Sequence, residues 1–442
     1  MAFFLFVVVT GILVLRPAEI IPDLHGVSLY EYAIVACFLL ALPEMLRYLT
    51  SRSLDSRPVT FCVLALLPVV VLSDLAGDNW DQTWEKFFYF FKVVIYFLLL
   101  VSLVTTPTRL RRFAFALLIY CTVLTTITVL HYHEVIDLTT LRQLADSDVD
   151  QQTGRNIIVT RLQATGMFQD PNELCVFLAA MVPLCLFFLL DSSAGVLRFA
   201  WIVPLGLFGY GIALTQSRGG FLAFAAGLAA LTWARFGWRR MTAWGLLGVP
   251  LLVVLFAGRQ TDISVSVGTG QTRVQLWSDW LEVFRENPLL GQGMVLPEAG
   301  VRKTPGYEVK QLAHNSYLQS FADLGLVGGT LFLGAICLAL ASLIRFGTGR
   351  THILQAPQQR IQPYLVGVVG AFGFGLLFLS VNYVIFTYLI VGLAATYPAM
   401  TRHWPPLPTL RFDLVVALRL ALLSFAFLAC TYVFVRLFVN WA

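Results

Sequence analysis

Charged residues are scarce in this sequence of 442 residues. They make up 12% of it, whereas 58% of the residues are hydrophobic and 14% are aromatic. A soluble domain carries about 25% charged residues, so this chain lacks the polar surface that such a domain presents to water. Its apolar residues instead come in repeated runs close to the ~20 residues that cross a bilayer as a helix. The shortage of charge therefore excludes a soluble globular protein and predicts a polytopic membrane protein.

Regular alternation, paired cysteines and internal repeats are also missing. Continuous apolar runs favour helices, because the strands of a membrane barrel alternate between apolar and polar residues. The seven cysteines all lie inside apolar runs, and none forms a Cys-x-x-Cys pair. They indicate neither a disulfide framework nor a metal cluster, so we interpret them as small core residues. The expected fold class is all-α.

The N-terminus lacks a basic segment and a small-residue cleavage site, so we expect a first membrane helix there and not a cleaved signal. Twelve spans are expected, or thirteen if the short first run and the last run, which contains Arg419, both cross fully. The expected spans lie near residues 2–15, 27–43, 59–74, 86–104, 113–130, 172–190, 196–214, 219–234, 241–257, 315–344, 363–381, 383–400 and 412–435.

Arginines set the expected orientation, because cytoplasmic loops are enriched in Lys and Arg. They follow the even-numbered spans in separate groups: residues 47, 52 and 57; residues 109, 111 and 112; residues 235, 239 and 240; residues 345, 350 and 360; and residues 402 and 411. These loops are therefore expected to be cytoplasmic, which places two long segments, 131–171 and 258–314, outside. We expect a single transmembrane domain over residues 1–442 with these two loops inserted in it.

Lysine is rare as well, since only four of the thirty basic residues are lysines. Arginine offers a planar fork of donors that matches phosphate oxygens, which lysine lacks. The predicted topology puts several of these forks at or beyond the outer membrane face, where cations are not expected: Arg161, Arg218, Arg273 and Arg285.

The turn LTQSRGGFLAF carries Arg218 ahead of two glycines, at the start of the next expected helix. Glycine lets the backbone approach a ligand closely, and helix N-terminal amides add positive potential. The turn therefore predicts an anion site at the membrane face. The alternative is an ordinary turn whose arginine reaches lipid phosphates.

The external segment GTGQTRVQLWSDWLEVFRENPLLGQG is expected to form an amphipathic helix on the membrane or over a cavity, with Thr272 as its N-cap. Arg273 then falls in the first turn, where a cation is unfavourable unless an anion is also present. The alternative is an arginine paired with Asp279 or Glu282.

Metal-binding patterns are also missing. DSDVD at residues 146–150 lacks the glycine and the last glutamate of an EF-hand loop, so we interpret it as a solvated acidic loop. Asp170, Pro171 and Asn172 make a good helix start, and capping is the favoured interpretation there. We expect no metal and no cofactor.

His314 and Asn315 stand where the second external loop meets a long apolar run. Asn315 suits the N-cap position. An imidazole with an ordinary pKa near ~6.5 can take a proton from a hydroxyl, and two arginines can hold a diphosphate leaving group. This combination of residues predicts transfer of a sugar from a lipid diphosphate.

Three motifs occur in a fixed order: TQSRGG at 215–220, TRVQLWSDWLEVFRENPLLGQG at 272–293 and AHNSYLQSFADLGLVGG at 313–329. They resemble the O-antigen ligase and polymerase superfamily of bacterial membrane glycosyltransferases, and FQDPNELCVFL before the sixth span is similar to the family pattern. The resemblance covers roughly residues 165–400, and the first five spans match only in hydropathy.

The resemblance implies a GT-C-like fold, a donor glycan linked to undecaprenyl diphosphate, a glycan or glycolipid acceptor, and metal-independent inversion on the periplasmic side of the inner membrane. Matched to the motifs, Arg218 and Arg273 bind the donor diphosphate, and His314 positions or deprotonates the acceptor hydroxyl. We further expect Arg161, Asn172, Arg285 and Asn315 to bind substrate.

Alternative functions stay open at this point. The acceptor could be lipid A core, a growing polysaccharide or a protein hydroxyl, which would make the chain a ligase, a polymerase or a protein O-oligosaccharyltransferase. Arginines inside a membrane protein also suit a transporter of the lipid-linked glycan or of a small anion. Discontinuous helices and inverted repeats would favour transport, and neither is evident in the sequence.

Overall fold

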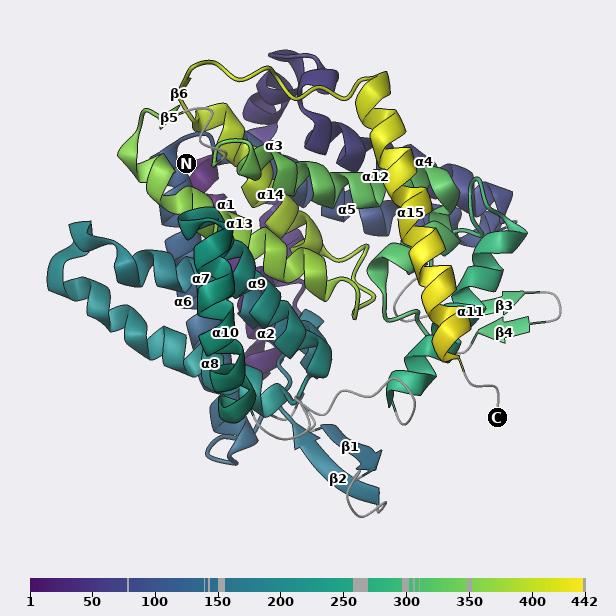
Figure 1. Cartoon of the computed structure of the whole chain (residues 1–442), viewed down its shortest axis with the longest axis horizontal. Helices are drawn as coiled ribbons and strands as arrows, with labels where there is room; N and C mark the ends of the chain where they lie inside the picture. The colour runs from purple at the N-terminus through teal and green to yellow at the C-terminus, as the bar shows by residue number, and fades with distance from the viewer. Residues whose placement is uncertain are drawn as a thin grey trace.

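The computed structural model describes residues 1–77, 79–138, 140–141, 144–149, 156–256, 269–295, 302–304, 307–309, 311–347 and 352–439, and this part of the chain is almost entirely helical (Figure 1). Its elements run in the order α1 (Ala2–Leu15), α2 (Pro17–Ile20), η1 (Pro22–Leu24), α3 (Leu29–Thr50), η2 (Leu54–Ser56), α4 (Pro58–Ala76), α5 (Trp80–Leu103), α6 (Pro107–Tyr132), β1 (Leu144–Val149), β2 (Asn156–Arg161), η3 (Gly166–Phe168), α7 (Pro171–Leu190), η4 (Ser192–Trp201), α8 (Ile202–Thr215), α9 (Arg218–Phe236), α10 (Trp238–Leu255), α11 (Thr269–Glu286), β3 (Arg302–Thr304), β4 (Tyr307–Val309), α12 (Ser316–Ile344), β5 (His352–Ile353), α13 (Ala356–Gly375), α14 (Ile385–Met400), β6 (His403–Trp404) and α15 (Leu414–Phe438).

Each of the thirteen expected spans coincides with a helix. Ten helical segments in the described part of the chain are long and apolar enough to cross a bilayer, and α14 is a shorter apolar helix. Helices α10 and α13 fall outside these ten, since their first turns hold arginine and glutamine side chains that lower the mean hydropathy. The chain is therefore an all-α polytopic membrane protein.

Two local predictions were wrong. Helix α11, which was expected to start after Thr272, begins at Thr269, so Arg273 is its fifth residue and lies just beyond the first turn. Most of the acidic segment DSDVD lies in strand β1, which pairs antiparallel with β2, and not in a loop. Strand pairing overrides the weak local preference of acidic residues for turns, because it satisfies every second backbone group in the ladder.

The helices pack in two main groups that meet at α13 and α14. Helices α7, α9 and α13 pack on one another, and α8 covers α7. Helices α4, α5, α12 and α14 form the second group, while α11 lies against α12 and α15. Figure 1 shows α11 beside α15, with the small β3–β4 hairpin next to them. The helices that carry the three sequence motifs (α9, α11 and α12) thus all contact this common core.

Helix α12 is broken at Gly325, whose φ of 65° and ψ of −168° are accessible almost only to glycine. A break leaves backbone N–H groups without helical acceptors, and in a membrane they must be satisfied by other parts of the protein. The segment after α11 does this: Leu326 N donates to Pro288 O at 2.7 Å, and Val327 N donates to Leu289 O at 3.3 Å. The break therefore fixes the segment after α11 to α12.

Asp323 lies fully buried at this break. Its Oδ2 accepts from the Tyr383 hydroxyl at 3.2 Å, and its backbone carbonyl accepts from Gly293 N at 2.9 Å and from the Ser73 hydroxyl at 2.5 Å. Asp323 thus helps to hold three separate segments together at the break in α12.

A buried ion pair completes this junction. Lys86 Nζ lies 3.0 Å from Asp74 Oδ1, with side chains 4% and 0% exposed, and the same Oδ1 accepts from Met294 N at 2.9 Å. Lys86→Met leaves a buried carboxylate without its cation, which costs about 3–5 kcal/mol. We expect a clear fall in the thermal unfolding midpoint in detergent.

The matched control for this variant is Lys92→Met. Lys92 pairs with Glu31 at 3.4 Å, but both side chains are at least half exposed, so this pair contributes only about 0–1 kcal/mol. Adding Asp74→Asn to Lys86→Met should recover part of the lost stability, because it removes the stranded charge. Equal midpoints for Lys86→Met and Lys92→Met would contradict this account of the junction.

Candidate functional site

The first part of the site is a hydrogen-bond network where β2 ends and α7 and α9 begin. Arg161 is 6% exposed; its Nε donates to Thr215 O and its Nη2 donates to Asn172 Oδ1, both at 2.9 Å. The same Asn172 oxygen accepts from the Ser217 hydroxyl at 2.7 Å. Since Ser217 caps α9 by accepting from Gly220 N, the network fixes the start of α9 relative to α7.

Asp170 caps α7, as the sequence predicted. Its Oδ1 accepts from Asn172 N at 2.7 Å and from Asn172 Nδ2 at 2.8 Å. The amide of Asn172 therefore donates to an acid on one side and accepts from Arg161 and Ser217 on the other. This arrangement aligns the carboxylate of Asp170 and the N-terminus of α9 within one continuous network.

Arg218 is the first residue of α9 and follows a strained residue. Gln216 has a left-handed backbone with φ of 50°, which is uncommon for any residue other than glycine. This conformation lets the chain turn sharply from α8 into α9. The following Gly219 packs so closely against Phe378 that a Cβ placed there would lie 2.6 Å from the Phe378 Cβ. The turn that carries Arg218 is therefore seated on the connection between α13 and α14.

His314 is attached to the same connection. Its backbone N donates to Ser380 Oγ at 2.9 Å, and Ser380 is two residues from Phe378. His314 also has a left-handed backbone, with φ of 47°. A strained, half-buried residue at this point must be held by its surroundings, which is a recurrent property of functional residues.

Asn315 caps α12, since its side chain accepts from Leu318 N at 3.2 Å, and it is 1% exposed. The next residue, Ser316, donates through its hydroxyl to Leu379 O at 2.7 Å and accepts from Val381 N at 3.0 Å. These bonds tie the start of α12 to residues on both sides of Ser380. The backbone around His314 is therefore anchored on both its flanks.

Helix α11 packs on the segment that leads into the site. Trp277 Nε1 donates to Ala313 O at 3.0 Å, and Trp280 Nε1 donates to Gln311 O at 3.2 Å. Arg273 lies one helical turn before Trp277, so it falls on the same face of α11. The two indoles thus dock the face that carries Arg273 onto the segment that leads into His314.

The charges of the site act directly on His314. Burial lowers the pKa of this imidazole below its ordinary value near 6.5, and the positive charge of Arg273 lowers the pKa further. The carboxylate of Asp170 opposes both effects and raises the pKa. The result is a lowered pKa, so the imidazole is neutral at pH 7 and can accept a proton.

The structure brings most of the predicted site residues together. Direct contacts join Arg161 and Asn172, and electrostatic interaction joins His314 to Arg273. Arg218 belongs to the same region, because Gly219 and Ser380 connect its turn to His314. Arg285 is separate: it lies about 18 Å farther along α11, is 71% exposed and pairs with Glu282 at 3.0 Å.

Sequence reasoning missed two residues of the site. Asp170 was expected only to cap α7, and its electrostatic effect on His314 depends on the packing of α7 near α12. Ser380 gave no signal, because a serine in an apolar run is ordinary. A half-buried acid at a helix start whose charge acts on a distant imidazole is visible only once the helices are assembled.

Comparison with known families agrees with the order of the motifs. Residues 203–333 match the family model described as O-antigen ligase. This stretch contains Arg218, Arg273, His314 and Asn315, and it ends within α12; the α7 start with Asp170 and Asn172 lies outside it. No curated protein matches the chain.

Proposed function

We propose that this chain, whose residues 203–333 match the O-antigen ligase family model, is a glycosyltransferase that moves a glycan from undecaprenyl diphosphate to an acceptor hydroxyl. One observation carries the proposal: an imidazole with a lowered pKa is acted on by the charges of an arginine and of an acid, at the start of a helix that bears one of the family motifs. The expected place is the periplasmic face of a bacterial inner membrane, since the arginine-rich loops lie on the other side.

The reaction needs a base, and His314 is suited to that role. The acceptor hydroxyl gives its proton to the neutral imidazole while its oxygen bonds to the anomeric carbon of the donor sugar. The bond between that carbon and the diphosphate oxygen breaks on the opposite side, so the configuration inverts. The products are the glycosylated acceptor and undecaprenyl diphosphate, and the histidinium returns its proton to water.

The leaving group gains negative charge as the bond breaks, and the two arginines are placed to hold it. Arg273 lies close enough to His314 to lower its pKa, and Arg218 heads α9, whose N-terminal amides add positive potential. Guanidinium groups fixed before the reaction stabilise this developing charge without a cost of reorganisation. A metal ion is not required in this scheme, because the arginines supply the positive charge.

Arg161 and Asn172 are proposed to act through this same arrangement, by fixing the start of α9 and the carboxylate of Asp170. The acceptor is proposed to be lipid A core or another surface glycan. A growing polysaccharide or a protein hydroxyl would use the same chemistry. Analysis of the product formed in a deletion strain identifies the acceptor.

The test is donor turnover by the purified protein in liposomes. We expect a labelled undecaprenyl-diphosphate-linked glycan to be consumed, with undecaprenyl diphosphate released and the acceptor labelled. Arg273→Ala should lower this turnover at least ~100-fold, as the loss of one charge-stabilising donor does in other enzymes. Arg239→Ala, at the opposite end of the helices, is the control for the loss of a positive charge.

A different result separates enzyme from transporter. Movement of the labelled donor across the liposome membrane with its glycosidic bond intact would overturn the proposed transfer reaction. Turnover that is normal in Arg273→Ala would instead leave the reaction standing and reject the role of that arginine. Both variants must first be shown to reach the membrane in wild-type amounts.

A further inference from the structure

A polar cavity lies at the ends of the candidate-site helices that are opposite to the candidate site. Helices α7, α9 and α12 begin at Asn172, Arg218 and His314 or next to them, and the cavity is lined by residues where the same helices end. Its volume is about 520 Å³. A helix of about 20 residues is ~30 Å long, so this cavity is distinct from the candidate site.

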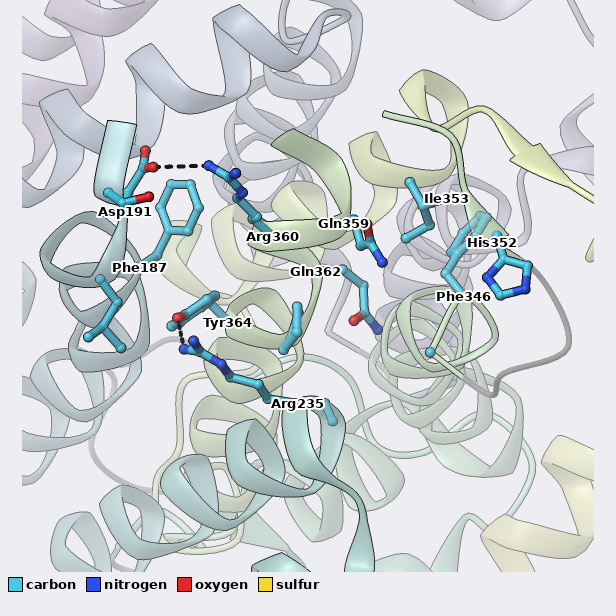
Figure 2. Close-up of a pocket in the computed structure, with 15 residues that line it drawn as sticks. Phe187, Asp191, Arg235, Phe346, His352, Ile353, Gln359, Arg360, Gln362 and Tyr364 are labelled. Carbon is cyan, nitrogen blue, oxygen red and sulfur yellow. Dashed lines mark hydrogen bonds and ion pairs between the residues drawn. The ribbon is translucent and has the colours of Figure 1, made fainter. Parts of the chain in front are cut away.

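The cavity is rich in positive charge (Figure 2). Asp191 is the one acid among the described residues that line it, whereas Arg235, Arg360 and His352 line it as well. Asp191 is buried and already bound: Arg111 Nη1 lies 2.8 Å from its Oδ2 and Arg360 Nη1 lies 3.5 Å from its Oδ1. This carboxylate is therefore paired with two guanidinium groups, of which Arg360 lines the cavity.

This carboxylate stays ionised. Burial alone would raise the pKa of Asp191, but hydrogen bonds from Ser193 and the charge of Arg111 outweigh burial and hold the pKa below its ordinary value. With Asp191 negative and Arg235 and Arg360 positive, the described lining carries one net positive charge, and Arg111 adds a second one beside Asp191.

Among the described residues that line the cavity, the one acid, Asp191, is paired with Arg360 and not with Arg235. Arg235 donates from Nη1 to the Tyr364 hydroxyl, and its guanidinium lies 5.5 Å from the centre of the same ring. Figure 2 shows Arg235 meeting Tyr364 while Arg360, one turn away on α13, meets Asp191. A guanidinium carries five donors, so these contacts leave donors for a ligand.

Other parts of the wall suit a ligand with a polar head and an apolar body. Gln359 and Gln362 add amide groups, and Phe187 and Phe346 form apolar surfaces. Leu190, also in the lining, is 51% exposed in a protein whose outer surface contacts lipid. The cavity therefore offers cationic forks beside surface that lipid chains can reach.

We propose that this cavity binds an anionic phosphate group at the membrane face opposite the candidate site, with Arg235 and Arg360 as its ligands. The same chemistry is offered by the headgroup of an anionic phospholipid and by free phosphate. A cavity with surplus positive charge favours an anionic ligand, and the planar guanidinium groups of arginine match phosphate oxygens in geometry and charge. The inference does not depend on the proposed transfer reaction.

The experiment measures binding to the full-length protein in detergent. Three probes are titrated: short-chain phosphatidylglycerol, short-chain phosphatidylcholine and inorganic phosphate. We expect Arg235→Gln to weaken phosphatidylglycerol binding about tenfold or more, the value of one charge-assisted hydrogen bond. Gln359→Glu should do the same by adding a negative charge, while every arginine and the Asp191 ion pairs remain in place.

The control is the double variant Arg239→Gln with Arg240→Gln, which removes two exposed arginines near the same membrane face that do not line the cavity. Binding of phosphatidylglycerol alone that is lost only in the cavity variants identifies a lipid headgroup. Binding of inorganic phosphate lost in the same variants identifies free phosphate. Equal affinities of cavity and control variants for every probe, or equal binding of phosphatidylglycerol and phosphatidylcholine with no phosphate binding, would overturn the proposal.

Discussion

Arg218→Lys is expected to lower glycan transfer at least ~100-fold, although it keeps the positive charge. One lost donor to a developing oxyanion costs ~10²–10³ in turnover, and lysine lacks the planar fork that meets two oxygens of a diphosphate at once. Arg218→Ala should lose at least as much. The measurement is single-turnover transfer from labelled donor by protein in liposomes.

The size of this effect follows from how rigidly the turn is held. Ser217 is bonded to Asn172, Gly219 is packed against Phe378, and Gln216 is fixed in a left-handed conformation. The shorter reach of lysine therefore cannot be recovered by a shift of the backbone. Arg239→Lys, on exposed α10, is the matched control and should transfer at the wild-type rate. Equal activity of Arg218→Lys and Arg239→Lys would reject a bidentate role for Arg218.

His314→Ala is expected to lower transfer by ~10²–10⁴, the usual contribution of a positioned base. The same role predicts how the wild type responds to pH. The pKa of His314 is lowered, so the imidazole is neutral at pH 7 and becomes protonated only below its ordinary value near 6.5. Transfer efficiency should therefore stay level near pH 7 and fall as the pH drops through the lowered pKa.

Two further variants should shift the pH at which transfer efficiency falls, here called the acid limb of the pH profile, in opposite directions. Arg273 lowers the pKa of His314, so Arg273→Gln should raise that pKa and shift the limb to higher pH in the activity that remains. Asp170 raises the pKa, so Asp170→Asn should shift the limb to lower pH. The measurement is the pH dependence of kcat/KM for each variant. A limb that moves the same way in both, or that persists in His314→Ala, would contradict the assignment of His314 as the base.

The motifs were readable from the sequence because they depend on local chemistry. A capping asparagine, an arginine before two glycines and an amphipathic repeat each reflect what a helix end or a helix face requires, and Asn315, Asp170 and α11 occur as helix caps and a helix in the structure. Helix boundaries were less accurate, as Thr269 shows, because several residues at the start of α11 can begin a helix. The β1 strand was missed because its partner β2 supplies the preference for extended backbone.

Hydrophobic content and the long apolar runs were enough to determine an all-α membrane protein, because the bilayer imposes these features on any chain that crosses it as helices. Contacts between distant segments were decided by the tertiary structure alone. The residues next to Asp323 in the sequence do not reveal that it contacts Tyr383 and Gly293. The residues next to His314 likewise do not reveal the effects of Arg273 and Asp170 or the bond to Ser380. The reason is physical: the pKa and backbone strain of His314 depend on neighbours that only the packing of α7, α11, α12 and the α13–α14 connection brings to it.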